Sequence, residues 1–277
     1  MPKADLNLIG KKTGPTECEY TWKDVILYAI GVGATARELS FVYEEAPGGL
    51  KVIPSFCVVP AVQIFPLFDE DIDWPLMIHG EHVIRLSQPL PPEGKVVQTG
   101  EVINIFDKGS GALFHVKMTG RTQDGDHLYD AEWFIFYLGA GDFGGDPGPK
   151  AVPVHPPEGR EPDFTVTEKV AENQAILYRL NGDLNPLHLV PEEAQRVGFD
   201  KPVLHGLCTY GFATRAIVNG FLEGDVSRLK EFKARFADIV YPGDTLTTQG
   251  WRSDEGVIIQ VKTERSVVLK NGIVIIE

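Results

Sequence analysis

The chain has 277 residues, of which 43% are hydrophobic and 23% are charged. These proportions are typical of a globular protein with one large domain or two ordinary ones. A balance of 26 Lys and Arg against 39 Asp and Glu leaves a formal net charge of −13, which argues against non-specific binding to nucleic acid or to anionic lipid. The longest apolar runs are too short to span a membrane, and the first residues lack an apolar stretch, so we expect neither a membrane span nor a signal peptide.

Cysteine usage and the C-terminal residues bear on the compartment. Cys18, Cys57 and Cys208 are odd in number and lack metal-ligand spacing, which favours free thiols in a reducing compartment. Residues 275–277 do not form a peroxisomal address of the Ser-Lys-Leu type. We therefore expect a cytoplasmic location.

The first half of the chain predicts an interrupted helix followed by four strands. Residues 55–68 are apolar, but Pro60 and Pro66 lie among them, so a full-length buried helix is improbable there. Alternation of apolar and polar residues predicts antiparallel strands at the segments 81–88, 95–107, 112–122 and 129–138.

Two histidines at the start of this region could suggest a metal site. His79 and His82 have no cysteine or carboxylate cluster to complete one, so a role at a strand edge is favoured. No glycine-rich phosphate loop or dinucleotide fingerprint follows a strand. We expect neither a metal nor a nicotinamide or flavin cofactor.

A connection rich in glycine and proline divides the chain nearly in half. Residues 138–160 have almost no apolar periodicity, which predicts domains at residues 1–150 and 151–277. The two halves are similar to each other, because residues 25–31 parallel residues 175–181 and residues 92–100 parallel residues 241–250. The second half is therefore expected to repeat the architecture of the first.

The segment from Tyr178 to His188 combines a carboxylate, an amide and an imidazole in one short run. Gly182 and Pro186 break regular structure around Asp183 and His188, so both side chains can face one cavity. An ionised carboxylate accepts hydrogen bonds and histidine can donate or accept near neutral pH, so the two could share one water molecule. This pair suits the addition of water beside a carbonyl, or its removal.

Asn185 would fix the water or the carboxylate in this interpretation. The alternative is that the segment is only a loop, in which Asp183 and Asn185 cap helices and His188 is a partly exposed surface residue.

A second segment, residues 201–220, predicts a buried helix that stops at Asn219-Gly220. Gly206 lies where this helix begins, and backbone N–H groups at a helix start have no partner within the helix, so they can hold an oxyanion. The alternative is that Gly206 serves only tight packing. His205 is interpreted as a structural residue.

The remaining residues predict a second antiparallel sheet. Strands are expected at the segments 229–240, 245–252, 257–268 and 273–276, separated by Tyr-Pro-Gly-Asp, Ser-Asp-Glu-Gly and Lys-Asn-Gly turns. A buried helix against a curved antiparallel sheet is the expected solution in each half. The predicted class is α+β.

The segment around Asp183 resembles the signature of the R-specific enoyl-CoA hydratases, also called hydratase 2 or MaoC-like dehydratases. The matching residues are Tyr178, Gly182, Asp183, Asn185, Pro186, Leu187, His188 and Ala194. Asn181 departs from the smaller residue usual in the family. The likeness continues at the segments 77–82, 89–95, 107–111 and 141–145, which resemble the hydratase 2 region of peroxisomal multifunctional enzyme type 2.

This resemblance implies a tandem, or double, hot-dog fold with a shortened or broken N-terminal helix. It implies Asp183, His188, Asn185 and Gly206 as catalytic residues, with Gly206 N–H holding the thioester oxygen. The N-terminal half has neither Asp nor His at the matching residues 32–38, so it is expected to be non-catalytic and to accommodate the acyl chain. Its expected lining includes Phe56, Val59, Val62 and Phe65, although these residues could equally fill the core.

The implied activity is hydration of trans-2-enoyl-CoA to (3R)-3-hydroxyacyl-CoA, in fatty acid metabolism, with coenzyme A as part of the substrate and no cofactor. An acyl-CoA thioesterase and a non-catalytic acyl-CoA-binding protein are the alternatives. Two such chains could pair as a homodimer. A peroxisomal location would be expected for a eukaryotic chain.

Overall fold

The computed structural model describes residues 2–62, 64–68, 72–150 and 152–277. The helices are α1 (Trp22–Gly31), α2 (Leu39–Val42), α3 (Val58–Ala61), α4 (Gln174–Arg179), α5 (Pro191–Arg196) and α6 (Gly206–Phe221). The strands are β1 (Lys12–Tyr20), β2 (Met77–Leu86), β3 (Gly94–Asp107), β4 (Gly111–Arg121), β5 (His127–Leu138), β6 (Phe164–Lys169), β7 (Leu229–Phe236), β8 (Thr245–Ser253), β9 (Gly256–Lys262) and β10 (Val267–Ile276). None of the described helices is both long and apolar enough to cross a lipid bilayer.

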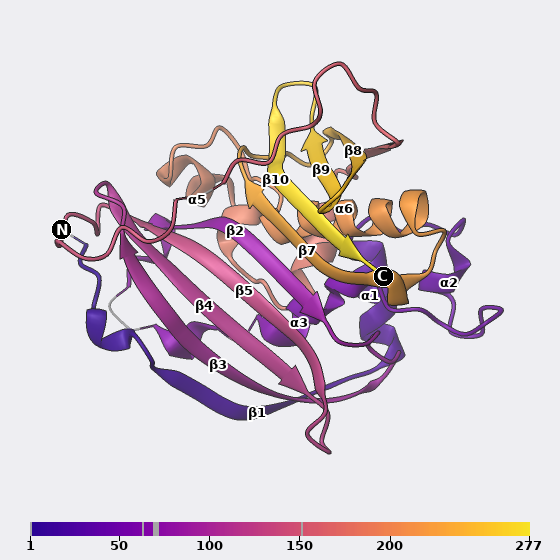
Figure 1. Ribbon diagram of the computed structural model, residues 1–277, viewed down its shortest axis with the longest axis horizontal. Coiled ribbons are helices and arrows are strands. Elements are labelled where there is room, and N and C mark those ends of the chain that lie inside the picture. Colours follow the sequence, from indigo (N-terminus) through magenta and orange to yellow (C-terminus); the bar gives the residue numbers. More distant parts are fainter. Residues whose placement is uncertain (1, 63, 69–71, 151) are drawn as a thin grey trace.

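All the described strands belong to one antiparallel sheet, in the order β1-β3-β4-β5-β2-β7-β10-β9-β8-β6. The five strands of the first half of the chain, β1 to β5, are therefore neighbours in the sheet, and so are the five of the second half. Figure 1 shows the strands of the two halves side by side. The halves join where β2 pairs with β7, from Glu81 opposite Arg235 to Arg85 opposite Glu231. The predicted pair of curved antiparallel sheets is confirmed, and the pairing of β2 with β7 joins them into one.

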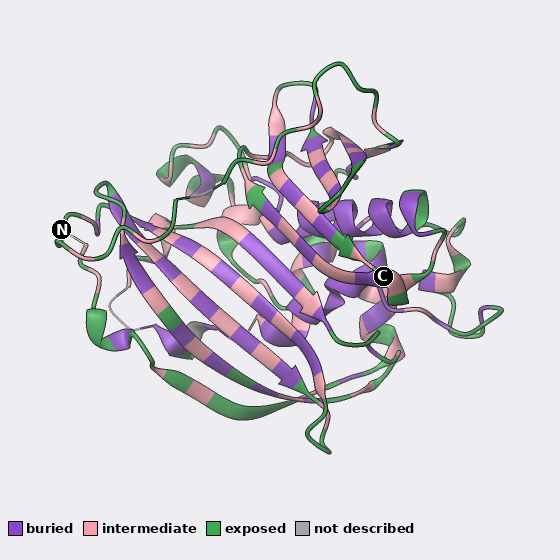
Figure 2. Cartoon of the chain, viewed as in Figure 1, coloured by how far each residue is buried: buried purple, intermediate pink, exposed green. Residues whose placement is uncertain are grey.

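Helix α6 is the central buried element. Its side chains from Leu207 to Val218 are all buried, and most of the helix is purple in Figure 2. A Cβ atom at Gly211 would lie 2.3 Å from Cγ1 of Val32, which follows α1, so glycine permits close approach at this point. The long strands of the first half alternate between buried and less buried residues in the same view, because successive side chains point to opposite faces of the sheet.

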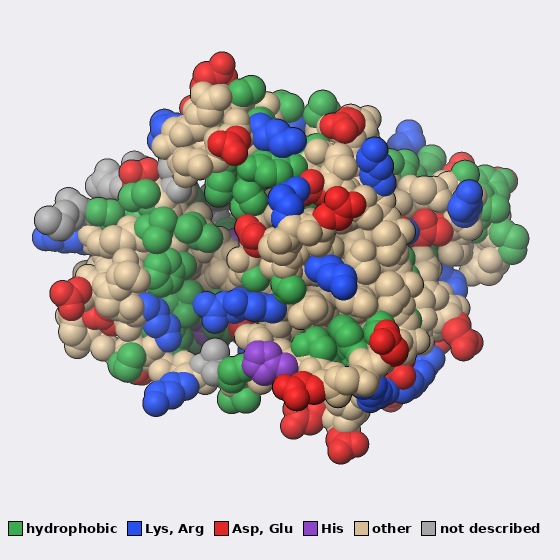
Figure 3. Space-filling view, turned by 90° about the horizontal axis from the view of Figure 1, so that it is seen from above, with side chains coloured by type: hydrophobic (Ala, Val, Ile, Leu, Met, Phe, Trp, Pro, Cys, Tyr) green, Lys and Arg blue, Asp and Glu red, His purple; other side chains and the backbone are tan. Residues whose placement is uncertain are grey.

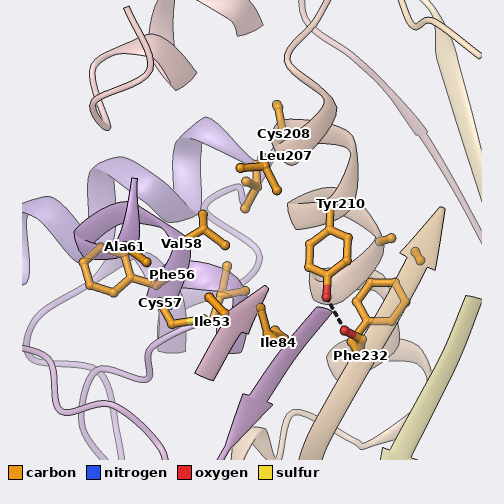
Figure 4. Packing of buried hydrophobic residues seen from close by; sticks show 14 of the residues in the cluster. Ile53, Phe56, Cys57, Val58, Ala61, Ile84, Leu207, Cys208, Tyr210 and Phe232 are labelled. Atoms are coloured by element: carbon orange, nitrogen blue, oxygen red, sulfur yellow. Dashed lines mark hydrogen bonds between the residues drawn. The ribbon is translucent and has the colours of Figure 1, made fainter. Parts of the chain in front are cut away.

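The corresponding helical segment of the first half is broken, as predicted. It consists of a 3₁₀ turn at Pro54–Cys57, the single turn α3 and a 3₁₀ turn at Phe65–Leu67. Proline lacks a backbone N–H and clashes with the preceding turn, which explains the interruption. Figure 4 shows Val58 of this segment in the same core as Leu207 at the start of α6.

The two similar segments at residues 25–31 and 175–181 each contain a helix, and these helices pack together. The side-chain amide of Gln174 in α4 donates to the carbonyl oxygens of Ile30 and Gly31 in α1, at 3.0 and 2.7 Å. The rings of Tyr28 and Tyr178 lie 6.1 Å apart. The two segments that are similar in sequence therefore pack against each other.

Strands β1 and β6 were not predicted. They occupy the two ends of the sheet, where each pairs with one neighbour. Most residues of β1 are exposed, so the strand shows little of the apolar alternation that reveals a half-buried strand.

The predicted turn at Lys270-Asn271-Gly272 is wrong. These residues lie within β10, where the pairing register shifts and Asn271 has a φ of 51°, so they form a bulge. The chain reverses earlier, between β9 and β10, and Thr263 N donates to the Ser266 carbonyl there. The predicted stop of α6 at Asn219-Gly220 is also too early, because the helix continues to Phe221.

The connection between the halves has no helix or strand from residue 139 to residue 150 or from residue 152 to residue 163. The Asp107 carboxylate at the end of β3 anchors its start by accepting from the backbone N–H groups of Asp142, Gly144 and Gly145. A hydrogen bond from Gly109 N–H, together with these three, holds the pKa of the Asp107 carboxyl below its usual value.

The expected strand-edge position of His79 and His82 is corrected by the sheet order. Strand β2 is a central strand, and His82 pairs with Trp133 of β5 on one side and with Ala234 of β7 on the other. A register shift between His79 and Glu81 accompanies a contact between the two imidazole rings, whose centroids are 5.3 Å apart. Burial lowers the pKa of His79 to about 3 and that of His82 well below its usual value.

Candidate active site

The turn that carries the predicted residues begins where α4 ends. Gly182 has a φ of 115°, a conformation that residues with a side chain rarely adopt, and it turns the chain toward Asp183. The Asn185 side-chain oxygen accepts from Leu187 N at 3.0 Å and caps the 3₁₀ turn at Pro186–His188. Asn185 N also donates to the Asp183 carboxylate at 3.2 Å. Asn185 therefore shapes the turn with its side chain and contacts the carboxylate through its backbone.

The fold brings Asp183 and His188 together and adds His205 to them. Each of the three side chains offers a nitrogen or oxygen atom, and these atoms all lie within 4.8 Å of one another. Asp183 and His188 are partly buried, and His205 is fully buried. A carboxylate and an imidazole at this separation can both reach one small molecule between them.

The hydrogen bond of His188 defines which ring nitrogen is available for chemistry. Its Nδ1 lies 2.9 Å from the Val203 carbonyl oxygen, and a carbonyl can only accept, so Nδ1 carries the hydrogen. In the neutral ring, Nε2 is then an acceptor. Burial lowers the pKa of His188, although the nearby Asp183 opposes this effect, and the neutral form is therefore favoured at neutral pH.

His205 contacts both members of this pair, which sequence reasoning did not anticipate. Its Nε2 donates to the Asp183 main-chain carbonyl at 3.2 Å, and its ring stacks on that of His188 with centroids 3.7 Å apart. Burial, reinforced by the neighbouring His188, lowers the pKa of His205 to about 2, so the ring stays neutral. The only sequence signal was its place beside Gly206.

Gly206 is the first residue of α6, as predicted. Its N–H has no hydrogen-bond acceptor among the described residues, and it lies at the positive end of a sixteen-residue helix. A Cβ atom at this position would lie 3.1 Å from the Phe236 ring, so the backbone is also closely packed. Both interpretations of this glycine, as an anion donor and as a packing residue, are consistent with its surroundings.

A small cavity lies beside Asp183. It is lined by Val58, Val59, Val62, Tyr178, Asn181, Asp183 and Leu207. Its volume is about 10 Å³, which is close to the space that one water molecule needs. The cavity joins residues from both halves, because the three valines belong to the broken helical segment of the first half and the other residues belong to the second half.

The four residues expected to receive an acyl chain do not share one environment. Val59 and Val62 line the cavity beside Asp183. Phe56 instead lies fully buried in the core, with its ring centroid 5.0 Å from Tyr20 and 5.6 Å from Tyr28. The Phe65 side chain falls outside the described part of the chain. Their assignment to substrate binding stays a prediction.

Asp183, His188 and His205 are also the donor set through which a metal ion could bind. Two features oppose this use. The two imidazole rings are stacked face to face, and His205 Nε2 already donates to a carbonyl.

On the face seen in Figure 3, basic and acidic side chains are interspersed, without one broad basic surface. Binding of an anionic group on that face would thus depend on a few local residues.

Comparison with known proteins identifies the family in both halves. A family described as "MaoC like domain" matches residues 153–273, and one described as "MFE-2 hydratase 2 N-terminal domain" matches residues 18–139. A Dictyostelium discoideum protein named probable enoyl-CoA hydratase 2 is 40% identical over 98% of this chain and 95% of its own length.

Solved structures agree with the sequence comparison. The crystal structure of a MaoC-like dehydratase from Phytophthora capsici superposes with a TM-score of 0.88 at 28% identity, over 99% of this chain and 98% of that one. A Mycobacterium tuberculosis protein described as having a double hotdog fold superposes with a TM-score of 0.63 at 13% identity, over 97% and 96% of the two chains, and it shows the fold alone. The predicted tandem hot-dog fold is confirmed. The chain belongs to the MaoC-like dehydratase family, in its two-module hydratase 2 form.

Proposed function

We propose that this protein catalyses the reversible hydration of trans-2-enoyl-CoA to (3R)-3-hydroxyacyl-CoA, a step of fatty acid metabolism. The observation that carries the proposal is the convergence of the Asp183 carboxylate and the His188 imidazole beside the start of α6. Family membership supports it, because relatives that match nearly the whole chain are named enoyl-CoA hydratases.

In the proposed mechanism, Asp183 and His188 hold the two hydrogens of one water molecule. Both groups accept, the first through its carboxylate and the second through Nε2, so an oxygen lone pair is free to attack C3. His188 Nε2 takes one water hydrogen and passes it to C2. The other water hydrogen, which points at the Asp183 carboxylate, remains on the new hydroxyl group. Gly206 N–H holds the thioester oxygen as it gains negative charge.

The two halves have different roles in this proposal. Residues 151–277 supply the catalytic groups, whereas residues 1–150 supply Val59 and Val62 to the cavity wall beside Asp183. We place the start of the acyl chain against these valines. The first half does not repeat the catalytic turn at residues 182–188, because its matching residues 32–38 include neither Asp nor His. There, Val32 O and Glu38 bind Arg215 of α6 instead.

The substrate is taken to be the coenzyme A thioester, and the reaction as written needs neither a metal nor a redox cofactor. A homodimer, a cytoplasmic location and a peroxisomal one for a eukaryotic source all stay predictions. Relatives named as peroxisomal enzymes support the last of these.

One assay tests the proposal against its closest alternative, a thioesterase. The purified protein is incubated with trans-2-enoyl-CoA esters of several lengths, and the enoyl absorbance and the free thiol are both measured. Loss of absorbance without thiol release supports hydration. Coupling to 3-hydroxyacyl-CoA dehydrogenases of each hand should then detect the (3R) product, and formation of the (3S) product would contradict the proposal.

The pH dependence of kcat/KM should reflect neutral His188. As pH falls through its pKa, Nε2 gains a proton and can no longer accept a hydrogen from water, so activity is lost on the acid side. Because burial lowers this pKa, we expect the midpoint to lie below the ordinary histidine value of about 6.5. Initial rates at subsaturating substrate across the acid range measure it. A midpoint above the ordinary value would argue against His188 as the acceptor.

Substitution of Gly206 can separate its N–H from its small size. Proline is favoured at the first position of a helix, and His205 has φ −57° and ψ 134°, which a following proline tolerates. Gly206→Pro therefore removes the donor at little cost to the helix. We expect kcat to fall by about 10² to 10³. Gly206→Ala is the matched control, because it adds a Cβ beside Phe236 but keeps the N–H.

An equal loss of kcat in both variants would assign Gly206 to packing alone. A much larger loss in Gly206→Pro, with similar thermal midpoints for both variants, would support the role of the N–H.

A further inference from the structure

His205 is the residue that physically links the three parts of the proposed site. It donates from Nε2 to the main-chain carbonyl of Asp183, its ring stacks on His188 with an interplanar angle of 29°, and Gly206 follows it in the chain. A third ring, that of Tyr178 in α4, lies 5.0 Å from it. It is fully buried, so these contacts exclude solvent.

We propose that His205 is a positioning residue, which sets the mutual placement of Asp183, His188 and the Gly206 N–H by holding the first through its backbone and the second through ring stacking. The inference rests on the proposed function. Its two contacts are chemically different, and they can therefore be removed one at a time.

A packing role alone does not explain why this residue is a histidine. Since Nε2 donates to a carbonyl, the neutral ring carries no hydrogen on Nδ1, and Nδ1 is buried without a partner among the described residues. Burying a polar atom without a hydrogen bond is unfavourable. Phenylalanine would fill similar space without this cost, so the donor at Nε2 must compensate for it.

The donor bond acts on the catalytic turn. The carbonyl that accepts it belongs to Asp183 itself, and Gly182 immediately before has the unusual backbone conformation described above. Loss of this bond would leave the Asp183 backbone free to shift. Misplacement of a reacting group by about 1 Å can lower turnover by about 10²-fold.

The stack acts on His188. A neutral ring against its face keeps water away and thereby favours the neutral imidazole, which the mechanism needs as an acceptor. The titratable groups that face His188 are Asp183 from the catalytic turn and His205 itself, and Arg179 of α4 is near His205. Asp183 raises the pKa of His188, whereas burial, to which the stack contributes, lowers it. Removal of the stack should therefore raise the pKa of His188.

Two variants of the full chain test the two contacts separately. His205→Gln keeps an N–H that can reach the Asp183 carbonyl but removes the ring. His205→Phe keeps the ring but removes the donor. The readouts are kcat for trans-2-enoyl-CoA and the pKa of His188 from an NMR titration of its ring, assigned by loss of the signal in His188→Asn. His155→Gln, at an exposed histidine of the connection, is the matched control.

We expect the pKa of His188 to rise toward about 6.5 in His205→Gln and to stay near its wild-type value in His205→Phe. We expect kcat to fall by about 10²-fold in His205→Phe. Variants that lose thermal stability but leave both readouts at the wild-type values would overturn the inference.

If His205→Gln does not fold, His205→Phe decides alone, and wild-type turnover in that variant would contradict the positioning role. A wild-type protein that does not hydrate any enoyl-CoA would refute the proposed function. The NMR titration would still show whether the stack controls the protonation of His188.

Discussion

Asp183→Asn is expected to lower kcat for enoyl-CoA hydration by about 10² to 10⁴ while leaving the fold intact. The amide oxygen of asparagine can still accept from Asn185 N, so the turn keeps the bond that now links these residues. The neutral amide lacks the negative charge with which the carboxylate holds the water hydrogen strongly and stabilises His188 as that ring takes the other hydrogen. Steady-state kinetics and the thermal midpoint of the same preparation measure the two effects.

Asp200→Asn is the matched control for this prediction. It removes one negative charge from an exposed residue of the same half, so turnover should stay close to that of the wild type. Near-normal turnover in Asp183→Asn would refute the assignment of the carboxylate.

His188→Asn is the companion variant. The asparagine amide nitrogen can donate to the Val203 carbonyl as Nδ1 does, but it provides nothing at the position of Nε2. We expect a loss of kcat in the same range, about 10² to 10⁴. Because the two residues act on one water molecule, the double variant should lose little more than either single one.

Arg215→Met is expected to lower the free energy of unfolding by about 3 to 5 kcal/mol. Arg215 lies in α6 with its side chain only 4% exposed, and it pairs with Glu38 of the first half and Glu168 of the second. Its Nε also donates to the Val32 carbonyl at 2.9 Å. Without the guanidinium, two partly buried carboxylates would face each other unpaired.

Urea unfolding of three variants tests this account. Arg196→Met removes an exposed pair with Glu193 and should cost no more than about 1 kcal/mol. Adding Glu38→Gln and Glu168→Gln to Arg215→Met should recover much of the stability, because no unpaired charge remains. If Arg215→Met lowers the free energy of unfolding no more than Arg196→Met does, the buried ion pairs of Arg215 do not stabilise the contact between the halves.

Much of the architecture could be predicted because strand patterns are local. Alternating side chains predict β3, β4 and β5 almost to their ends, and Pro60 and Pro66 predict the broken helix. The missed strands β1 and β6 lie at the ends of the sheet, where weak burial leaves weak alternation.

The residues of the bulge in β10 predict a turn for a related reason. Asn-Gly favours positive φ both in hairpins and in bulges, so the residue types do not distinguish the two. The pairing of β10 with β7 and β9 on either side of Asn271 decides it.

The sequence by itself determined the turn that carries Asp183 and His188, because these residues are close along the chain. Gly182 beside them and Pro186 between them prevent a regular helix. It also determined the family. Only the tertiary structure placed His205 against both residues, Val59 and Val62 beside Asp183, and Arg215 between the halves. These contacts join residues far apart in the chain, and they depend on how α6 packs between two modules, which no local pattern of residues encodes.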